Sequence, residues 1–240
     1  MRNTLIRLEA IANAFATIFK RRKSKTVDSL DSLSEFTASR AAFIAQKTMY
    51  GYTKARMGTR FPEMFRDPNI IHSVNIAKMH HFAACLSDLS IFVTSRALAD
   101  PRFTDKTRRA LADHMFTRAL NENLDHSVDE FDPAEAQSKF KQRVAFTNWA
   151  QPISLDDFFV LSPQSIIRWA PIAEPLKARD REFVENSVRY SWIEISRVFK
   201  KCFQAEKTRT DILASDLAIE RTIDGDVDGA TKDGAAKADV

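Results

Sequence analysis

The segment from Asp67 to Ala99, DPNIIHSVNIAKMHHFAACLSDLSIFVTSRALA, decides the fold. Asp67 before Pro68 pairs a good N-cap with proline at the first helical position. Apolar residues then follow two stripes at helical spacing: Ile70, Val74, Ala77, Cys85, Leu89 and Phe92 on one, and Ile76, Met79, Ala83 and Leu86 on the other. A helix that is apolar on more than one side belongs in the centre of a fold. We therefore predict a central helix over residues 68–99.

The scarcity of glycine extends the helical prediction to the rest of the chain. Only Gly51 and Gly58 occur before Asp224, whereas β-rich folds use glycine in their tight turns. The aromatic residues are 18 Phe against 3 Tyr and 3 Trp, and Phe is an apolar filler typical of a buried core. The fold class predicted from these features is all-α, with one multi-helix, bundle-like domain over residues 34–205.

Proline and small polar residues indicate where several of these helices begin. Asp132-Pro133 gives a cap and a first turn, and Glu135 adds the acid of a capping box. Ser162-Pro163 gives the same start signal, and Thr104 is a further cap candidate. We expect helices at about 3–20, 35–60, 68–99, 105–125, 133–150 and 177–205, with short ones at about 154–161, 163–170 and 211–221.

Residues 1–26 form a basic amphipathic segment. Their apolar face would contain Leu5, Leu8, Ile11, Ala12, Phe15, Ile18 and Phe19, and the cluster from Lys20 to Lys25 follows at once. An apolar helix face beside a polybasic patch provides the two signals that stable attachment to an anionic membrane requires. The candidate membrane-surface residues are Leu8, Phe15, Phe19, Lys20, Arg21, Arg22 and Lys23. A helix that docks on protein, followed by a solvated basic linker over 21–33, explains the same pattern equally well.

The opposite end of the chain differs in charge and composition. Residues 206–240 are predicted to be an acidic, largely disordered tail, because they are small, polar and nearly free of large apolar side chains. Cys85 and Cys202 show no metal-type or redox-type spacing, which favours a reducing compartment. No run reaches the length of apolar residues that a membrane-spanning helix needs. We therefore expect a cytoplasmic protein, either free in the cytoplasm or at the inner face of the membrane.

A candidate binding stripe lies between residues 36 and 66. Aromatic and cationic side chains alternate on one helix face, which could hold phosphate groups, nucleobases or lipid headgroups. The candidate binding residues are Arg40, Lys47, Tyr50, Lys54, Arg56 and Arg60. The opposite face is rich in alanine, which permits close helix packing. In the alternative interpretation, the Lys and Arg stems only cover aromatic rings at the edge of the core.

The same region carries a resemblance to a known family. The segments from Ala45 to Tyr52 (AQKTMYGY), from Arg56 to Pro62 (RMGTRFP) and from Ala83 to Leu89 (AACLSDL) resemble the signature block of a family of uncharacterised proteins of alphaproteobacterial type. The similarity covers residues 40–95. Some members of that family are labelled esterases, so the resemblance implies a small hydrolase as one functional alternative.

His81, Cys85 and Asp88 are the candidate chemical groups of the central helix. Their spacing would point them to one side, where His114 or His126 could complete a metal site. A thiol beside an imidazole could also act as a nucleophile with its base. The interpretation we favour is a buried, hydrogen-bonded structural cluster. No cofactor is expected, because the glycine-rich and paired-cysteine motifs of common cofactor sites are absent from the sequence.

These features favour a non-catalytic peripheral membrane or scaffold and assembly protein that binds a protein partner. The hydrolase implied by the resemblance is the first alternative. A helical nucleic-acid-binding protein is the second, and the acidic tail and the lack of a recognisable base-reading motif count against it. The partners expected are therefore a protein and, for the N-terminal segment, an anionic membrane surface, while the oligomeric state is left open.

Overall fold

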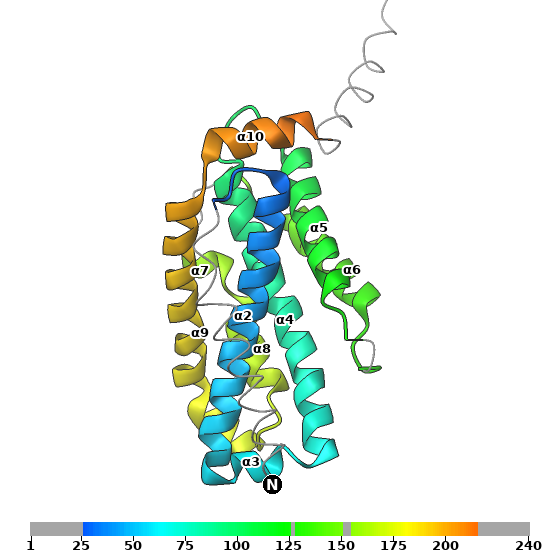
Figure 1. Ribbon diagram of the computed structural model, residues 1–240, viewed down its shortest axis with the longest axis vertical. Coiled ribbons are helices and arrows are strands. Elements are labelled where there is room, and N and C mark those ends of the chain that lie inside the picture. Colours follow the sequence, from blue (N-terminus) through cyan, green and yellow to red (C-terminus); the bar gives the residue numbers. More distant parts are fainter. Residues whose placement is uncertain (1–25, 126–127, 151–154, 216–240) are drawn as a thin grey trace, which may run out of the picture.

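The structure is a computed structural model that describes residues 26–125, 128–150 and 155–215 of the 240-residue chain. Three long helices run side by side along the molecule (Figure 1): α2 (Leu30–Met57), α4 (Pro68–Ala97) and α9 (Glu174–Cys202). Within the described ranges there is no β-strand, and the β-type pairing found there is an isolated bridge between Val27 and Phe203. The prediction of an all-α, bundle-like domain is confirmed.

Shorter elements surround the three long helices. They are the 3-10 turn η1 (Gly58–Arg60), α3 (Phe61–Met64), α5 (Asp105–Glu122), α6 (Pro133–Phe146), α7 (Leu155–Phe158), α8 (Leu161–Trp169) and α10 (Ala205–Ala214). Helix α5 packs against α4 and α2, α6 packs on α5, and α8 lies between α4 and α9. Helix α10 crosses the end of the bundle where α2 begins and α9 ends (Figure 1).

Helix α4 occupies the centre of this bundle, as its two apolar stripes predict. It contacts α2, α5 and α8, so packing partners surround it on several sides. Every residue from Cys85 to Thr94 is buried, and Leu86, Leu89 and Val93 have no exposed surface. Each such large apolar side chain stabilises the fold by about 1.5–3 kcal/mol when it is removed from water. The central-helix prediction is confirmed.

Three of the predicted N-caps are present in the structure. The Asp67 carboxylate accepts a hydrogen bond from the backbone N–H of Asn69, and α4 begins at Pro68. The Thr104 hydroxyl accepts from Thr107 at the start of α5, and Asp132 caps α6 in the same way. These caps satisfy backbone donors that the first turn of a helix leaves without a partner. Local signals therefore place these helix starts correctly.

The linker predicted over residues 21–33 is wrong in its second half, because α2 already begins at Leu30. The Ser29 hydroxyl accepts a hydrogen bond from the backbone N–H of Ser32, and the Ser32 hydroxyl accepts one from the N–H of Ser29. This is a capping box with serine in place of the usual Glu or Gln. The substitution of serine hid the start signal from the sequence analysis.

The domain also extends past the predicted boundary at residue 205. The backbone of Val27 donates to the carbonyl oxygen of Cys202 at 2.9 Å and accepts from the N–H of Gln204 at 2.8 Å. In α10 the hydroxyl of Thr208 donates to the same Val27 carbonyl at 3.1 Å, and Ile212 has no exposed surface. The short helix expected at 211–221 therefore lies at Ala205–Ala214, inside the predicted tail.

Both predicted terminal appendages fall largely outside the described residues. This applies to residues 216–240 of the tail and to residues 1–25 of the amphipathic segment. The candidate membrane-surface residues outside the described ranges are Leu8, Phe15, Phe19, Lys20, Arg21, Arg22 and Lys23. Among the described helices, none is both long and apolar enough to cross a lipid bilayer.

Candidate functional site

His81 and Cys85 meet inside the bundle, whereas Asp88 belongs to a separate cluster. The Cys85 Sγ atom lies 3.8 Å from His81 Nε2, and both side chains are completely buried. His81 Nε2 is 2.8 Å from the Thr48 hydroxyl of α2, and its Nδ1 is 3.3 Å from the Ser165 hydroxyl of α8. The Thr48 hydroxyl donates its proton to a backbone carbonyl of α2, so we infer that His81 Nε2–H donates to Thr48.

Burial holds both groups in their unreactive forms. Desolvation lowers the pKa of His81 to about 3, so the imidazole is neutral at physiological pH. Desolvation, and then the negative charge of Asp88, raise the pKa of the Cys85 thiol. A reactive cysteine instead needs an electropositive and accessible setting that lowers its pKa. The geometry therefore favours the structural interpretation of His81 and Cys85 over a nucleophile with its base.

Asp88 ties four helices together. Its carboxylate accepts from Arg143 of α6 at 2.6 Å, and from the backbone N–H and the hydroxyl of Ser162 of α8 at 2.8 and 2.7 Å. The indole N–H of Trp192 of α9 donates to the Ser162 hydroxyl at 2.8 Å. Ser162 was predicted to cap its own helix, and that prediction is wrong because its hydroxyl binds Asp88 of α4 and α8 begins at Leu161.

The Asp88 carboxylate is paired with donors on both oxygens. The N–H of Leu161 adds a longer contact of 3.3 Å to Oδ1, beside the Arg143 bond. Burial raises the pKa of Asp88, while the Arg143 guanidinium and the hydrogen bonds from Ser162 act to lower it. All of these groups present hydrogens to the carboxyl oxygens, an arrangement that favours the ionised form. A buried charge of this kind fastens α4 to α6 and α8.

No metal site was found among the described residues: no group of three or more His, Cys, Asp or Glu side chains there could hold a metal ion. His114 is described and half-buried in α5, while His126 falls in the gap at residues 126–127. Within the described ranges, His81, Cys85, Asp88 and His114 therefore do not form the ligand set considered from the sequence.

A Cys85→Ala substitution tests the structural role of this cluster. We expect it to lower the free energy of unfolding by about 1–2 kcal/mol, because it leaves a modest cavity next to His81. In the native wild-type chain, a thiol reagent should react with neither Cys85 nor Cys202 until the protein unfolds, because both are buried. Urea titration and thiol labelling measure the two effects. Rapid native labelling of Cys85, or stoichiometric zinc or iron in protein purified without added metal, would contradict the structural role.

The candidate binding stripe on α2 consists of three aromatic–cation pairs, each four residues apart. Arg40, Lys47 and Lys54 lie over the rings of Phe36, Phe43 and Tyr50, at 5.5, 5.6 and 5.9 Å from the ring centres. The pairs repeat every seven residues along one helix face. The rings become more exposed along α2, from a buried Phe36 to a Tyr50 that is 37% exposed.

The six candidate binding residues do not form one surface. Arg56 makes a bidentate ion pair with Asp180 of α9, and the Tyr52 hydroxyl donates to the same carboxylate at 3.1 Å. Arg56 therefore fastens α2 to α9, and Arg40 is half-buried. Tyr50, Lys47 and Lys54 are exposed on the stripe, and Arg60 is exposed on η1. The alanine face is buried as expected: Ala41 and Ala45 are 0% and 1% exposed.

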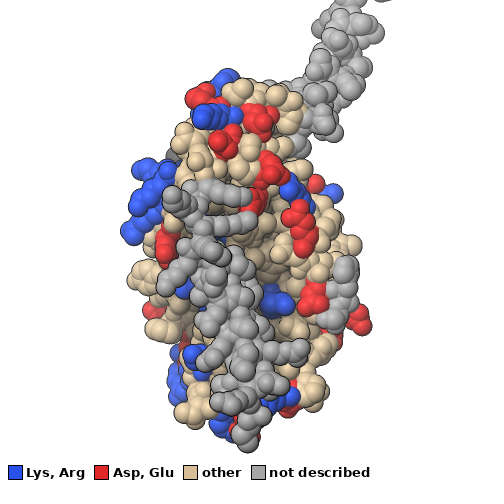
Figure 2. All heavy atoms as spheres, in the orientation of Figure 1, with Lys and Arg blue, Asp and Glu red and all other residues tan. Residues whose placement is uncertain are grey.

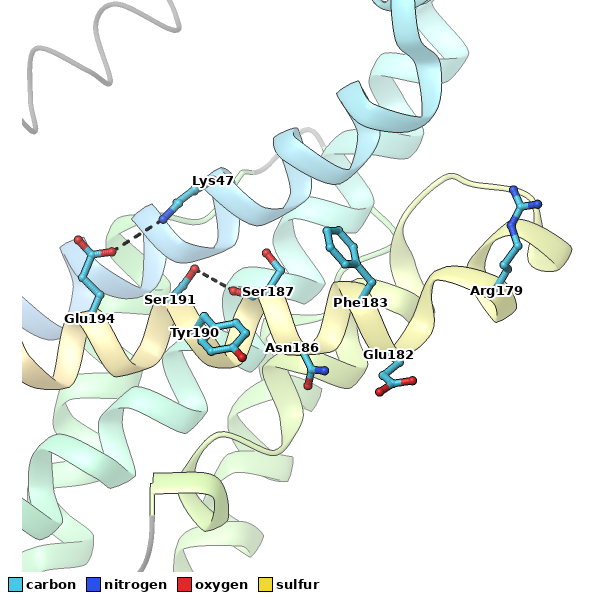
Figure 3. Close-up of a pocket in the computed structure, with 9 residues that line it drawn as sticks. All are labelled: Lys47, Arg179, Glu182, Phe183, Asn186, Ser187, Tyr190, Ser191 and Glu194. Carbon is cyan, nitrogen blue, oxygen red and sulfur yellow. Dashed lines mark hydrogen bonds and ion pairs between the residues drawn. The ribbon is translucent and has the colours of Figure 1, made fainter.

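An open groove of about 720 Å³ lies between α2 and α9 (Figure 3). We call it the α2/α9 groove, and its lining consists of Lys47, Arg179, Glu182, Phe183, Asn186, Ser187, Tyr190, Ser191 and Glu194. Figure 3 shows Lys47 reaching from α2 toward Glu194, while Phe183 and Tyr190 project from α9. Phe183 is 80% exposed and Tyr190 is 72% exposed.

This groove was not predicted from the sequence, because phenylalanine was taken there as a filler of the buried core, whereas Phe183 is exposed. The core face of α9 consists of Val184, Val188, Trp192, Ile195 and Phe199, which are spaced by three or four residues and are all buried. Phe183 and Tyr190 lie seven residues apart on a different face. A helical wheel of α9 separates this exposed aromatic pair from the buried face. The pair is the signal that the sequence contained.

Comparison with known protein families, with curated proteins and with solved structures gave no match for this chain. The fold and the site therefore define the class by themselves: an all-α bundle with a buried polar cluster at its centre and an aromatic groove on its surface.

Proposed function

We propose that this chain is a non-catalytic binding protein whose α2/α9 groove receives an amphipathic helix of a protein partner. The observation that carries the proposal is the exposed pair Phe183 and Tyr190 on the wall of an open groove. Covering on the order of 100 Å² of each ring would stabilise a complex by about 2–3 kcal/mol per ring. Large exposed aromatic side chains next to a hollow are typical of interaction sites.

The spacing of the pair fits a helical partner. Residues seven apart on α9 lie on the same face, about 10.5 Å apart along the helix axis. A helix that packs alongside would present apolar side chains at positions i, i+3 or i+4, and i+7, which is the usual pattern of helix-in-groove recognition. From α2 the groove is lined by Lys47, and Phe43 and Tyr50 lie about one turn to either side of Lys47 along that helix.

The charges of the groove make apolar complementarity the main basis of recognition. Its lining contains two cations, Lys47 and Arg179, and two anions, Glu182 and Glu194. Lys47 and Glu194 lie 4.0 Å apart across the groove, so each offsets the other. A balanced lining does not select for a strongly acidic or a strongly basic ligand. The partner helix we expect therefore has an apolar stripe and few charged residues beside it.

Photo-cross-linking tests this proposal directly. Phe183 or Tyr190 is replaced by p-benzoylphenylalanine, and irradiation in lysate of the host cell is followed by mass spectrometry. We expect cross-links to one helical segment with apolar residues at i, i+3 or i+4, and i+7, and a peptide of that segment should bind the full chain. Tyr190→Glu should lower the affinity of the chain for that peptide by at least about tenfold, since the substitution places a charge against an apolar stripe.

Phe146 provides the matched control. It is 90% exposed at the end of α6, away from the α2/α9 groove (Figure 1). The photo-reactive residue at position 146 should give none of the cross-links that positions 183 and 190 give, and Phe146→Glu should leave peptide affinity unchanged. Equal cross-linking from all three positions, or peptide binding that Tyr190→Glu does not weaken, would refute the groove as the binding site.

A further inference from the structure

We infer that two copies of this chain associate through α9, with the exposed aromatic pair of each copy packed against the pair of the other. The inference rests on the proposed function in one respect, namely that the α2/α9 groove is a surface that receives a helix. It adds a specific occupant, a second copy of α9, when the chain is concentrated and no other partner is bound. Three features of α9 support it: the symmetric spacing of its groove residues, the side of the helix on which they lie, and their charges.

The groove residues of α9 are spaced symmetrically about the midpoint of the segment 179–194. Phe183 and Tyr190 lie on either side of this midpoint, each about 5 Å from it along the helix axis. Arg179 and Glu194 lie farther out, each about 11 Å from it. When a second copy of α9 lies antiparallel to the first, with a two-fold axis at the midpoint, Phe183 comes level with Tyr190 of the second copy. Arg179 comes level with Glu194 in the same way, and the symmetry provides each contact twice.

These four residues share one side of α9, which faces away from the core of its own bundle. At about 100° per residue, Phe183 and Tyr190 lie within about 10° of one line along the helix, and both rings project from α9 (Figure 3). Arg179 and Glu194 lie within about 30° of that line. Val188, which has no exposed surface, lies about 150° around the helix from it. The four residues are exposed, and we call them the α9 stripe. A second copy can therefore approach the α9 stripe from solvent.

The residues that come level with each other are chemically complementary. Phe183 would meet the ring of Tyr190, and a contact between two aromatic rings stabilises a complex beyond the area that it buries. Arg179 would meet the carboxylate of Glu194, and a guanidinium can donate two hydrogen bonds to a carboxylate. Glu194 lies 4.0 Å from Lys47 of its own chain, an exposed contact that leaves the carboxylate able to accept from a second cation. The α9 stripe therefore has both the apolar surface and the charges that a second copy of itself requires.

The size and the polar centre of this contact predict a weak, reversible dimer. Asn186 and Ser187 lie on either side of the two-fold axis, so the middle of the contact is not apolar. Residues 179–194 span about 23 Å of helix, and two helices packed over this length bury on the order of 1,000 Å² in total, which is below the area of most stable complexes. We expect a dissociation constant on the order of 10–100 µM. In dilute lysate the chain is then monomeric, and its groove is open to the partner proposed above.

Charge reversal in the purified full chain tests the inference. Sedimentation equilibrium of the wild type should show a reversible monomer–dimer equilibrium. Arg179→Glu alone, or Glu194→Arg alone, should raise the dissociation constant about tenfold, because each places two pairs of like charges opposite each other. The two substitutions together make these pairs opposite in charge again and should restore a dissociation constant close to that of the wild type. A heterologous partner would not produce this rescue, because its own charges do not change.

Photo-cross-linking measures the register of the two helices. Isotopically light and heavy chains, each with p-benzoylphenylalanine at position 183, are mixed at a concentration that favours the dimer and irradiated. We expect products that join a light chain to a heavy chain, with the cross-link close to Tyr190 of the second copy. Phe183→Glu with Tyr190→Glu should abolish dimerisation, whereas the matched Phe146→Glu variant should dimerise as the wild type does. Circular dichroism should be the same for all variants, because every substituted side chain is exposed.

Three results would overturn the inference. They are a wild-type chain that remains monomeric at every concentration, a dimer that the combined charge reversal does not restore, and cross-links that join only peptides with the same isotope label. The last result would place another segment of the same chain on the α9 stripe. A monomeric chain that still cross-links to a different protein in dilute lysate would overturn this inference alone. A dimeric chain that cross-links to no other protein would overturn the proposed function alone.

Discussion

Acidification from pH 7 to pH 4 is expected to lower the free energy of unfolding by about 3 kcal/mol through His81 alone. The pKa of His81 is lowered to about 3 in the folded protein by complete burial, whereas an unfolded histidine titrates near pH ~6.5. Below pH ~6.5, His81 of the unfolded chain therefore binds a proton, whereas His81 of the folded chain stays neutral until the pH approaches about 3. The part of the free energy of unfolding that depends on neutral His81 is fully present above pH ~6.5, and it is lost as the pH falls toward the pKa of the folded state.

The slope of the free energy of unfolding against pH tests whether His81 causes the loss of stability. Between pH ~6 and ~4 the loss from His81 should amount to about 1.4 kcal/mol for each pH unit. A His81→Gln variant should be less stable at pH 7, because its contacts to Thr48 and Ser165 change, but its stability should depend less on pH. Urea denaturation at pH 7, 6, 5 and 4 gives the free energies to compare.

His72 is the control for this titration. It is exposed and lies 2.8 Å from Glu130, so its substitution by Gln should leave most of the slope in place. Burial also lowers the pKa values of His80 and His114, and both remain in either variant. The difference between wild type and His81→Gln therefore isolates His81. If the free energies of unfolding of the wild type and of His81→Gln changed in parallel with pH, protonation of His81 would not destabilise the folded state.

Local signals account for how much of the fold could be predicted from the sequence. Asp67, Thr104 and Asp132 cap the helices that they were expected to cap, because capping depends on a few neighbouring residues and the backbone. The apolar stripes of α4 likewise placed it in the centre, because a helix that is apolar on several sides needs partners on several sides. Both kinds of signal act within one helix and can be recognised without knowing its neighbours.

Contacts between distant segments could not be predicted in this way. Val27 is buried because it pairs with the end of α9, and nothing adjacent to Val27 in the sequence indicates that partner. Ser162 has the sequence context of a cap, but Asp88 competes for its hydroxyl from another helix. Tertiary hydrogen bonds of this kind override a local preference when the competing group is a buried charge.

The candidate site likewise has one feature that could be predicted from the sequence and one that could not. The aromatic–cation pairs of α2 could be predicted because each pair lies within one helix, four residues apart. The groove could not be predicted from the sequence, because its lining comes from α2 and from a part of α9 that is more than a hundred residues away in the chain. The ion pair of Arg56 with Asp180, which removes Arg56 from the stripe, joins the same two helices. Only the packing of α9 on α2 creates the groove.

Replacement of Asp88 by Ala is expected to lower the free energy of unfolding by about 3–5 kcal/mol. The substitution would leave the Arg143 guanidinium without its carboxylate partner, although it keeps hydrogen bonds to Ser87 and to the Phe158 carbonyl. It would also remove the acceptor for the backbone N–H and hydroxyl of Ser162. Unpaired buried donors account for most of the expected loss.

An exposed ion pair provides the control, because its loss shows how much stability a charge interaction contributes when the side chains are not buried. Arg118 pairs with Asp31 at 2.6 Å and with Glu122 at 2.9 Å, yet all three side chains are substantially exposed. Arg118→Ala should therefore cost less than about 1 kcal/mol. Because Asp88 connects α4 to α6 and α8, and α8 contacts Trp192 of α9, its loss should also increase hydrogen exchange in α8 before the rest of the bundle unfolds. Similar losses from the two substitutions, or exchange in α8 that does not change, would show that the Asp88 contacts do not fasten these helices.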